Sequence, residues 1–422
     1  MMRGGDMGKN LLVDLRPLRD APAFARVWKG NTIQGLGTQA AVVAITLMVF
    51  ERTGSSLAVG LIGLCVAIPT IVLAPLGGLL ADRSDRRRLT RMTAAAQTLV
   101  ALGFMAQALI PNVWLGAAYL LVALQAAIGA LAVPARRTLL RTIVPPTLLP
   151  AAIILTLLSG NLGMILGPAL GGLLLSVGMA WACFGLQLVG SVAVLIAAVR
   201  LPAIPGSSAP GSTGFGGIAE GAVFVARHRV LRGVFLADLS LTMLALPIAL
   251  LPALNAERFG ADPLIFGLLS AAPAIGAALL GLGSGALGRL RWRGPALLIT
   301  TALFGGLMVG VALSGYWWIT LILLGLGGIL DAVSISLAQI IVQEETPDSL
   351  RGRVGALEHM VGMGGPQLGA TRAGLFGNWW GAGIGIAAGG ICAIVAAAAL
   401  GANRTGLRGY RAAASTDADE SR

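Results

Sequence analysis

The sequence contains few charged side chains. Aspartate, glutamate, lysine and arginine make up 11% of the 422 residues, whereas hydrophobic residues make up 56%. A soluble domain carries roughly 25% charged residues, so a water-exposed surface over most of this chain is excluded. The uncharged segments 53–81, 93–134 and 142–199 each exceed the roughly 20 apolar residues that cross a bilayer as a helix. The sequence therefore predicts an all-α membrane protein with many spans.

Cysteine and histidine are scarce as well. The three cysteines, Cys65, Cys183 and Cys392, lie far apart within apolar segments and are expected to be free thiols. The two histidines, His228 and His359, are too few and too widely separated to form a metal site. The sequence also shows no nucleophile, base and acid in an arrangement typical of an enzyme. We expect no bound metal, no other cofactor and no enzymatic activity.

The charges that are present are mostly positive and regularly distributed. The 30 lysine and arginine residues give the chain a net charge of +12, and they cluster between apolar segments instead of forming one patch for nucleic acid. Only Arg52 and Arg258 fall in connections expected on the opposite side, as the positive-inside rule describes. The breaks predict twelve transmembrane helices, called spans one to twelve, near residues 30–50, 56–81, 90–110, 114–135, 148–175, 179–199, 232–255, 264–287, 295–314, 316–341, 354–376 and 380–400. Both termini are then expected in the cytoplasm, with the chain in the inner membrane of a bacterium.

A linker divides the spans into two groups of six. Residues 201–231 begin with a segment rich in glycine, proline and serine and end with a segment that fits an amphipathic surface helix. The expected domains are a cytoplasmic segment (1–29), an N-terminal bundle (30–200), the linker (201–231), a C-terminal bundle (232–400) and a cytoplasmic tail (401–422).

The two groups of spans repeat one another in sequence. GPALG at residues 167–171 in span five returns as GPQLG at residues 365–369 in span eleven, 198 residues later. Residues 77–87 also align with residues 283–293, at an offset of 206. Parallel six-helix repeats are typical of transporters whose substrate sites lie near the membrane midplane, between the repeats.

The stretch GGLLADRSDRRRL, residues 77–89, resembles the signature of the loop between the second and third helices of the major facilitator superfamily. The matching residues are Gly78, Asp82, Arg83, Arg86 and Arg88. Asp85 stands where that signature usually has glycine. The resemblance implies that this loop contacts the inner end of span eleven in the outward-facing state and acts as a latch. For the arginines, a solvated loop that only fixes orientation is the alternative.

Span five resembles the antiporter signature of the same superfamily. Its glycines at 163, 167 and 171 give one helical face that a neighbouring backbone can approach closely, and Pro168 is expected to bend the helix. We expect Gly163, Gly167, Pro168 and Gly171 to take part in gating, with the two halves in contact along the glycine faces of spans five and eight and of spans two and eleven. Tight packing alone is the other interpretation. In span four, Gln125 stands where the superfamily's signature has an arginine associated with proton coupling.

Three stretches are most similar to the enterobactin (siderophore) exporter group of this superfamily: residues 11–28, 74–89 and 345–357. The resemblance implies a secondary active exporter that works by alternating access, with protons as coupling ion and a siderophore or similar small molecule as substrate. It also implies function as a monomer in the lipid bilayer. A multidrug or macrolide efflux pump is the alternative, and a non-transporting receptor or scaffold is a further one.

A few polar side chains interrupt the spans. Asp331 falls midway through span ten and Asp238 about two turns into span seven. An aspartate at a helix centre costs about 2.5–3.5 kcal/mol on the insertion scale, so both are candidate proton or substrate groups, with a helix–helix hydrogen bond as the alternative. The amides of Asn31, Gln34 and Gln125 are candidates for substrate binding or for bonds between helices.

Two further charges lie in span eleven. Glu358, near the inner end, is expected to be solvated. Arg372, toward the outer end, is expected either to extend its charge to the membrane surface or to bind an anion.

Overall fold

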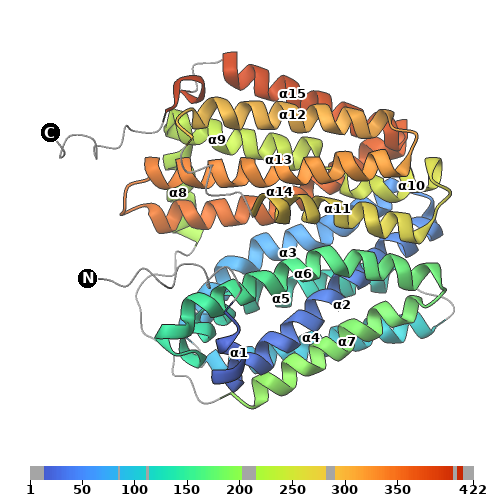
Figure 1. Cartoon of the computed structure of the whole chain (residues 1–422), viewed down its shortest axis with the longest axis vertical. Helices are drawn as coiled ribbons and strands as arrows, with labels where there is room; N and C mark the ends of the chain where they lie inside the picture. Colours follow the sequence, from blue (N-terminus) through green and yellow to red (C-terminus); the bar gives the residue numbers. More distant parts are fainter. Residues whose placement is uncertain are drawn as a thin grey trace, which may run out of the picture. The chain divides into compact units, whose positions relative to one another are not determined.

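The computed structural model describes residues 14–83, 86–110, 114–201, 215–281, 290–402 and 406–411. Within these ranges every regular element is a helix (Figure 1). The first half of the chain forms α1 (Arg16–Asp20), α2 (Pro22–Thr53), α3 (Ser56–Arg83), α4 (Arg86–Leu109), α5 (Leu115–Ile143), α6 (Leu149–Ser176) and α7 (Ala180–Val199). The second half forms α8 (Phe215–Arg227), α9 (Arg229–Leu239), α10 (Leu251–Arg258), α11 (Pro263–Gly281), α12 (Arg293–Leu313), α13 (Trp317–Glu345), α14 (Arg351–Trp380) and α15 (Ala382–Ala402).

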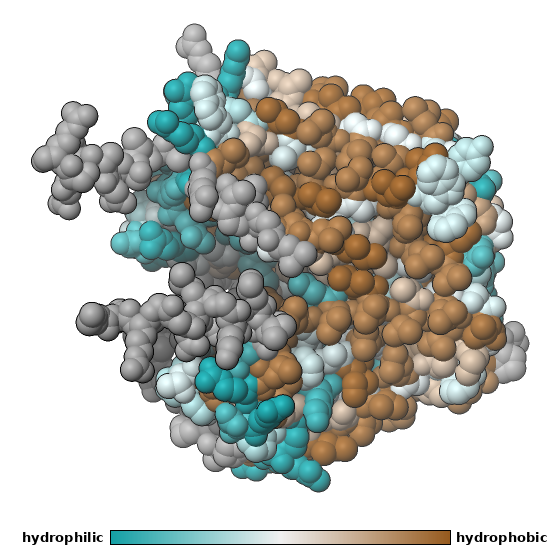
Figure 2. Space-filling view, viewed as in Figure 1, coloured by the Kyte–Doolittle hydropathy of each residue, from teal (hydrophilic) through white to brown (hydrophobic). Residues whose placement is uncertain are grey.

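Each expected span coincides with a helix or a series of helices. In the described part of the chain, eleven helical segments are long and apolar enough to cross a membrane. The remaining expected span, span eleven, corresponds to α14, which has 30 residues but whose glycines and charged residues reduce its hydropathy. Along the helices, the surface is mainly hydrophobic in the view of Figure 2. The prediction of an all-α membrane protein is confirmed.

Contacts between residues divide the chain into two compact units. Unit 1 contains residues 1–52, 65–214 and 262–271, and unit 2 contains residues 53–64, 215–261 and 272–422. The start of α3 therefore belongs to unit 2 and the start of α11 to unit 1.

Close contacts between paired glycines explain why the start of α3 groups with unit 2 and the start of α11 with unit 1. In unit 2, a Cβ atom on Gly60 of α3 would lie 3.2 Å from the Cα atom of Gly374 on α14. In unit 1, a Cβ atom on Gly172 of α6 would lie 2.9 Å from the Cα atom of Gly267 on α11. Helices approach this closely only where side chains are absent. The expected contacts between spans two and eleven and between spans five and eight are thus present.

Span seven is not the single helix that the sequence suggested. The helix α9 ends at Leu239 and continues as a π-helix, η2 (Ser240–Ala245). Leu246 is then extended, with φ −66° and ψ 122°. A 3₁₀ turn, η3 (Ile248–Leu250), leads into α10. The residue before a proline is disfavoured in the helical region, so Pro247 is the sequence feature that breaks this span.

The segments beyond the bundles pack onto the ends of the helices. In unit 2, α8 buries Ile218 and Val225 in a hydrophobic cluster with Leu231, Leu297 and Val354. The amphipathic helix expected in the linker is therefore present as α8. Glu220 on α8 forms an ion pair with Arg353 at the start of α14.

The chain beyond α15 returns to the bundle at η5 (Leu407–Gly409). Leu407 is fully buried in the same cluster, and the hydroxyl of Tyr410 donates to Oε2 of Glu344 at 2.9 Å.

Candidate functional site

Three acidic side chains lie near one another in unit 2. Asp238 is in the last turn of α9, Asp331 is near the middle of α13 and Glu358 is in the second turn of α14. All three are half-buried. Asp238 interacts electrostatically with both Asp331 and Glu358. The structure therefore brings together the two aspartates that the sequence singled out.

Glu358 was not expected in this group. Its position near the start of span eleven suggested a solvated side chain, whereas the structure places it within electrostatic reach of Asp238. We call Asp238, Asp331 and Glu358 the acidic group. Within the described ranges, none of the three carboxylates forms an ion pair or a hydrogen bond with a basic side chain. The sequence signal that was overlooked is the position of Glu358 about two turns after the start of α14, inside the helix and not at its end.

A buried hydroxyl lies one helical turn from Asp331. Ser334 is three residues further along α13, and residues at this spacing share a helix face. Its side chain is 1% exposed, and its Oγ atom has no hydrogen-bond partner among the described residues. Buried hydroxyls normally have a partner. The face of α13 that carries Asp331 therefore also carries an unused hydrogen-bonding group.

The amides singled out in the N-terminal half join helices of unit 1. The Nε2 atom of Gln34 on α2 donates to Oε1 of Gln97 on α4 at 2.8 Å and to Oγ of Ser191 on α7 at 3.1 Å. In a separate pair, Nε2 of Gln187 on α7 donates to Oε1 of Gln125 on α5 at 3.2 Å.

Asn31 joins neither pair, and its Oδ1 atom is buried without a partner in the described structure. These bonds correspond to the helix-joining alternative for Gln34 and Gln125. Substrate binding by Asn31, Gln34 and Gln125 stays a prediction.

The glycine stripe of span five faces a different helix from the one expected. A Cβ atom on Gly167 would lie 2.5 Å from Cβ of Gln39, and one on Gly171 would lie 2.9 Å from Cα of Ala40. Gly163 likewise approaches α2, at Gly35. The stripe therefore packs against span one, and the expectation that it faces span eight is wrong. The four-residue spacing keeps the stripe on one face of α6, and that face is turned toward α2.

A neighbouring face of α6 makes the contact with span eight. The carbonyl oxygen of Pro168 lies 2.5 Å from the position of a Cβ atom on Gly267 of α11, and Gly172 approaches the same helix. Pro168 lies inside α6, which continues through it to Ser176. A gating role for Gly163, Gly167, Pro168 and Gly171 stays a prediction.

The residues of the proposed latch fall at the junction of α3 and α4. Gly78, Asp82 and Arg83 belong to the end of α3, and Arg86 is the first residue of α4. The side chains of Asp82, Arg83 and Arg86 lie outside the described part of the structure, as does Asp85. Their role in a latch stays a prediction.

Arg372 has a partner inside unit 2. Its Nη2 atom donates to the backbone carbonyl of Leu244, in η2, at 2.5 Å. The guanidinium carbon also lies 5.4 Å from the centre of the Phe376 ring, one turn along α14. The side chain thus binds a backbone carbonyl within its own unit instead of extending to the membrane surface.

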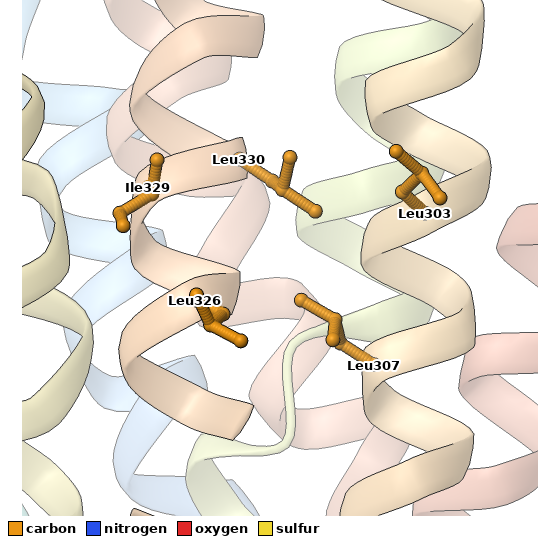
Figure 3. A pocket seen from close by; sticks show the side chains of 5 residues that line it. All are labelled: Leu303, Leu307, Leu326, Ile329 and Leu330. Carbon is orange, nitrogen blue, oxygen red and sulfur yellow. The ribbon is translucent and has the colours of Figure 1, made fainter. Parts of the chain in front are cut away.

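An apolar cavity of about 240 Å³ lies between α12 and α13 (Figure 3). Its lining side chains are Leu303, Leu307, Leu326, Ile329 and Leu330. Leu303 is 55% exposed and Leu326 is 44% exposed, so the cavity opens on the hydrophobic surface. It contains none of the polar residues discussed above and suits a hydrocarbon chain.

Comparison with known proteins agrees with this architecture. Residues 13–420 match the family described as transmembrane secretion effector. The chain is 29% identical to the enterobactin exporter EntS of Citrobacter koseri over 368 residues, which cover 87% of this chain and 88% of that protein. It is also 29% identical to EntS of Escherichia coli O81 over 370 residues, with the same coverage.

Solved transporter structures share the fold at low identity. The nucleoside transporter NupG superimposes with a TM-score of 0.73 at 12% identity and covers 90% of this chain and 98% of that one. A bacterial homologue of the iron transporter ferroportin, in an inward-facing state, gives a TM-score of 0.68 at 15% identity, with 90% and 98% coverage. The fold, the family match over nearly the whole chain and the similarity to exporters together lead to one conclusion: the protein belongs to the transmembrane secretion effector family of major facilitator transporters and is a multi-pass membrane transporter, not an enzyme.

Proposed function

We propose that this protein is a proton-coupled secondary active exporter that works by alternating access and exports a siderophore of the enterobactin type. The observation that supports the substrate class is the 29% identity to enterobactin exporters over 87% of the chain. We further propose a location in the bacterial inner membrane with both termini in the cytoplasm, in line with the distribution of basic residues.

The acidic group supports the proton coupling. Asp238 lies in electrostatic reach of Asp331 and Glu358, and no basic side chain neutralises these carboxylates within the described ranges. Carboxylates that are close together cannot all remain ionised at low cost, so they favour the uptake of a proton or another cation. Ionisable groups within membrane spans are typical of proton relays.

Transport in proteoliposomes tests the coupling. We expect Asp331→Asn to abolish enterobactin efflux driven by a pH gradient, because the variant cannot take up and release the coupled proton. Exchange of enterobactin across the membrane without a gradient is expected to continue. Asp348→Asn is a matched control, because Asp348 is an acidic residue whose side chain is 87% exposed and which pairs with Arg351. Unchanged gradient-driven efflux in Asp331→Asn would refute the coupling.

A multidrug efflux pump is the second candidate, and the acidic group is the observation that favours it. Uncompensated carboxylates suit a cationic substrate, whereas a catecholate siderophore suits basic groups. The two candidates differ in their response to the lipophilic cation ethidium. Efflux of ethidium that stops in Asp238→Asn, together with no flux of enterobactin, would favour the drug pump.

The junction of α3 and α4 is the proposed latch of the outward-facing state. We expect Asp82→Asn to expose the inner half of span ten, which a cysteine at Ser336 would report by faster reaction with a polar maleimide. Arg88→Gln is the control and is expected to have a much smaller effect. Equal labelling of the Asp82→Asn variant and its parent would leave the loop as an orientation signal only.

A further inference from the structure

The break in span seven leaves backbone carbonyl groups without helical donors. A regular helix pairs each carbonyl with an N–H group four residues later. The π-helix η2 pairs carbonyls with N–H groups five residues later, and the extended Leu246 then ends the helix, whose last carbonyls need other donors. A membrane interior offers no water to pair such groups, so irregular backbone persists there only where protein supplies the partner. For the carbonyl of Leu244, that partner is Nη2 of Arg372, at 2.5 Å.

Glycines of two neighbouring helices lie against the backbone of η2. A Cβ atom on Gly369 of α14 would lie 2.4 Å from the carbonyl oxygen of Thr242. A Cβ atom on Gly389 of α15 would lie 2.3 Å from the carbonyl oxygen of Leu244. Two neighbouring helices thus present glycine to the backbone carbonyls of the irregular segment.

The hydrogen bond from Arg372 to Leu244 can open without separating two opposite charges. Its acceptor is a neutral carbonyl, and no carboxylate contacts the guanidinium in the described structure. The ring of Phe376, on the same helix, holds the side chain in place. Asp238 lies at the other end of the same irregular stretch, where its backbone carbonyl accepts a hydrogen bond from Oγ1 of Thr242 at 2.8 Å.

We propose that the break in span seven is a hinge and that Arg372 is the positioning residue that keeps it closed, so that η3 and α10 can move relative to α9 only when the bond to Leu244 opens. The proposal rests on the alternating-access part of the proposed function. It does not depend on the identity of the substrate or on coupling to protons.

Cysteine labelling of the purified protein in detergent tests the hinge. The reporters are Ala253→Cys, after the break in α10, and Ala237→Cys, before the break in α9; both alanines are buried. Cys65, Cys183 and Cys392 are first replaced by serine or alanine. We expect Arg372→Gln to accelerate maleimide labelling at position 253 by at least about tenfold, the factor that corresponds to losing one hydrogen bond to a charged group. Labelling at position 237 should keep its parental rate.

The conservative variant separates positioning from packing. Lysine at position 372 can still donate to the carbonyl of Leu244, so Arg372→Lys should restore most of the slow labelling at position 253, whereas Arg372→Met should label as fast as Arg372→Gln. Parental labelling at position 253 in Arg372→Gln would overturn the proposal. Equal acceleration at positions 237 and 253 would also overturn it, because Arg372 would then only support packing of the whole unit. The assay contains no substrate and no gradient, so a failure of the proposed export activity would leave these rates unchanged.

Discussion

Span one and span seven occupy equivalent places in the two halves of the sequence, but one is continuous and the other is broken. The repeated glycines pack against both spans in the same way. Gly167 and Gly171 of α6 are in close contact with α2. Their counterparts in α14, Gly365 and Gly369, are in close contact with η2. The shared packing motif therefore does not decide whether the packed span is regular.

The last span of each half shows the same relation. Gly190 of α7 lies against the backbone of Gln34 in α2, and Gly389 of α15, 199 residues later, lies against the carbonyl of Leu244 in η2. In unit 1 the backbone that meets the glycine belongs to a helix with its own hydrogen bonds. In unit 2 it belongs to an irregular segment that needs Arg372. The two halves thus share the close helix contacts, and in unit 2 the backbone at these contacts is irregular.

The largest expected effect compares these two glycines. A Cβ atom on Gly190 would lie 2.3 Å from the backbone nitrogen of Gln34, and one on Gly389 would lie 2.3 Å from the carbonyl oxygen of Leu244. We expect Gly190→Ala to lower the free energy of unfolding by about 3 kcal/mol and Gly389→Ala by about 1 kcal/mol, because a rigid helix cannot yield to overpacking as an irregular segment can. Denaturant unfolding in mixed micelles measures both.

Gly185→Ala is the control for both variants. No atom lies within 4 Å of the position of its Cβ atom, so the substitution should stabilise α7 slightly through helix propensity. Equal losses for Gly190→Ala and Gly389→Ala would show that span seven is as rigid at its break as span one.

The polar side chains of the two spans give the next comparison. Gln34 of span one binds Gln97 and Ser191, whereas the carboxylate of Asp238 in span seven has no hydrogen-bond partner in the described structure. Gln34→Leu removes the hydrogen-bond partner of the buried Ser191 and of the half-buried Gln97 and should cost about 1–3 kcal/mol of unfolding free energy. Asp238→Asn should leave the unfolding free energy unchanged and reduce gradient-driven efflux. If the double variant Gln34→Leu, Ser191→Ala is more stable than Gln34→Leu alone, the structural role of Gln34 is supported. A loss of unfolding free energy in Asp238→Asn would contradict the role of Asp238 in transport alone.

Much of this fold was predictable from the sequence, because long uncharged segments and positive clusters leave few ways to arrange a chain in a bilayer. The twelve helical regions and the close approach of spans two and eleven followed from hydropathy and glycine patterns. The direction of the stripe at Gly163, Gly167 and Gly171 did not, because spacing defines a helix face but not the neighbour that it meets. Glu358 was misplaced for the same reason. The break at Leu246 was signalled by Pro247, but the uninterrupted hydropathy of the region concealed it.

Proline 247 offers a smaller test of the broken span. Pro247→Ala restores a backbone N–H group and removes the restriction on Leu246, so span seven should become more like span one. We expect slower hydrogen exchange of the amides at residues 246–250 and a few-fold slower efflux. Pro252→Ala is the control, because proline fits the first turn of α10 without disturbing it. Faster hydrogen exchange of these amides in Pro247→Ala would show that the proline stabilises the irregular segment and does not cause the break.

The smallest expected effect concerns the chain ends of the two units. In unit 1 the N-terminal segment packs through apolar contacts of Ala21 and Phe24, whereas in unit 2 the C-terminal segment also depends on the bond from Tyr410 to Glu344. Burial, together with the hydrogen bond to Glu344, raises the pKa of Tyr410 above its ordinary value. The neutral phenol is thus favoured in the folded state.

Its contribution to stability is therefore complete below the ordinary pKa of tyrosine, about 10, and is lost as the pH rises through the higher pKa of the folded state. Tyr410→Phe should lower the free energy of unfolding near neutral pH by about 0.5–1 kcal/mol, the value of one partly exposed hydrogen bond. It should also remove part of the loss of stability that the parent shows between neutral pH and about pH 10.5. Thermal unfolding of both proteins at the two pH values measures this difference. An identical pH response would mean that the C-terminal segment, like the N-terminal one, is held by its apolar contacts alone.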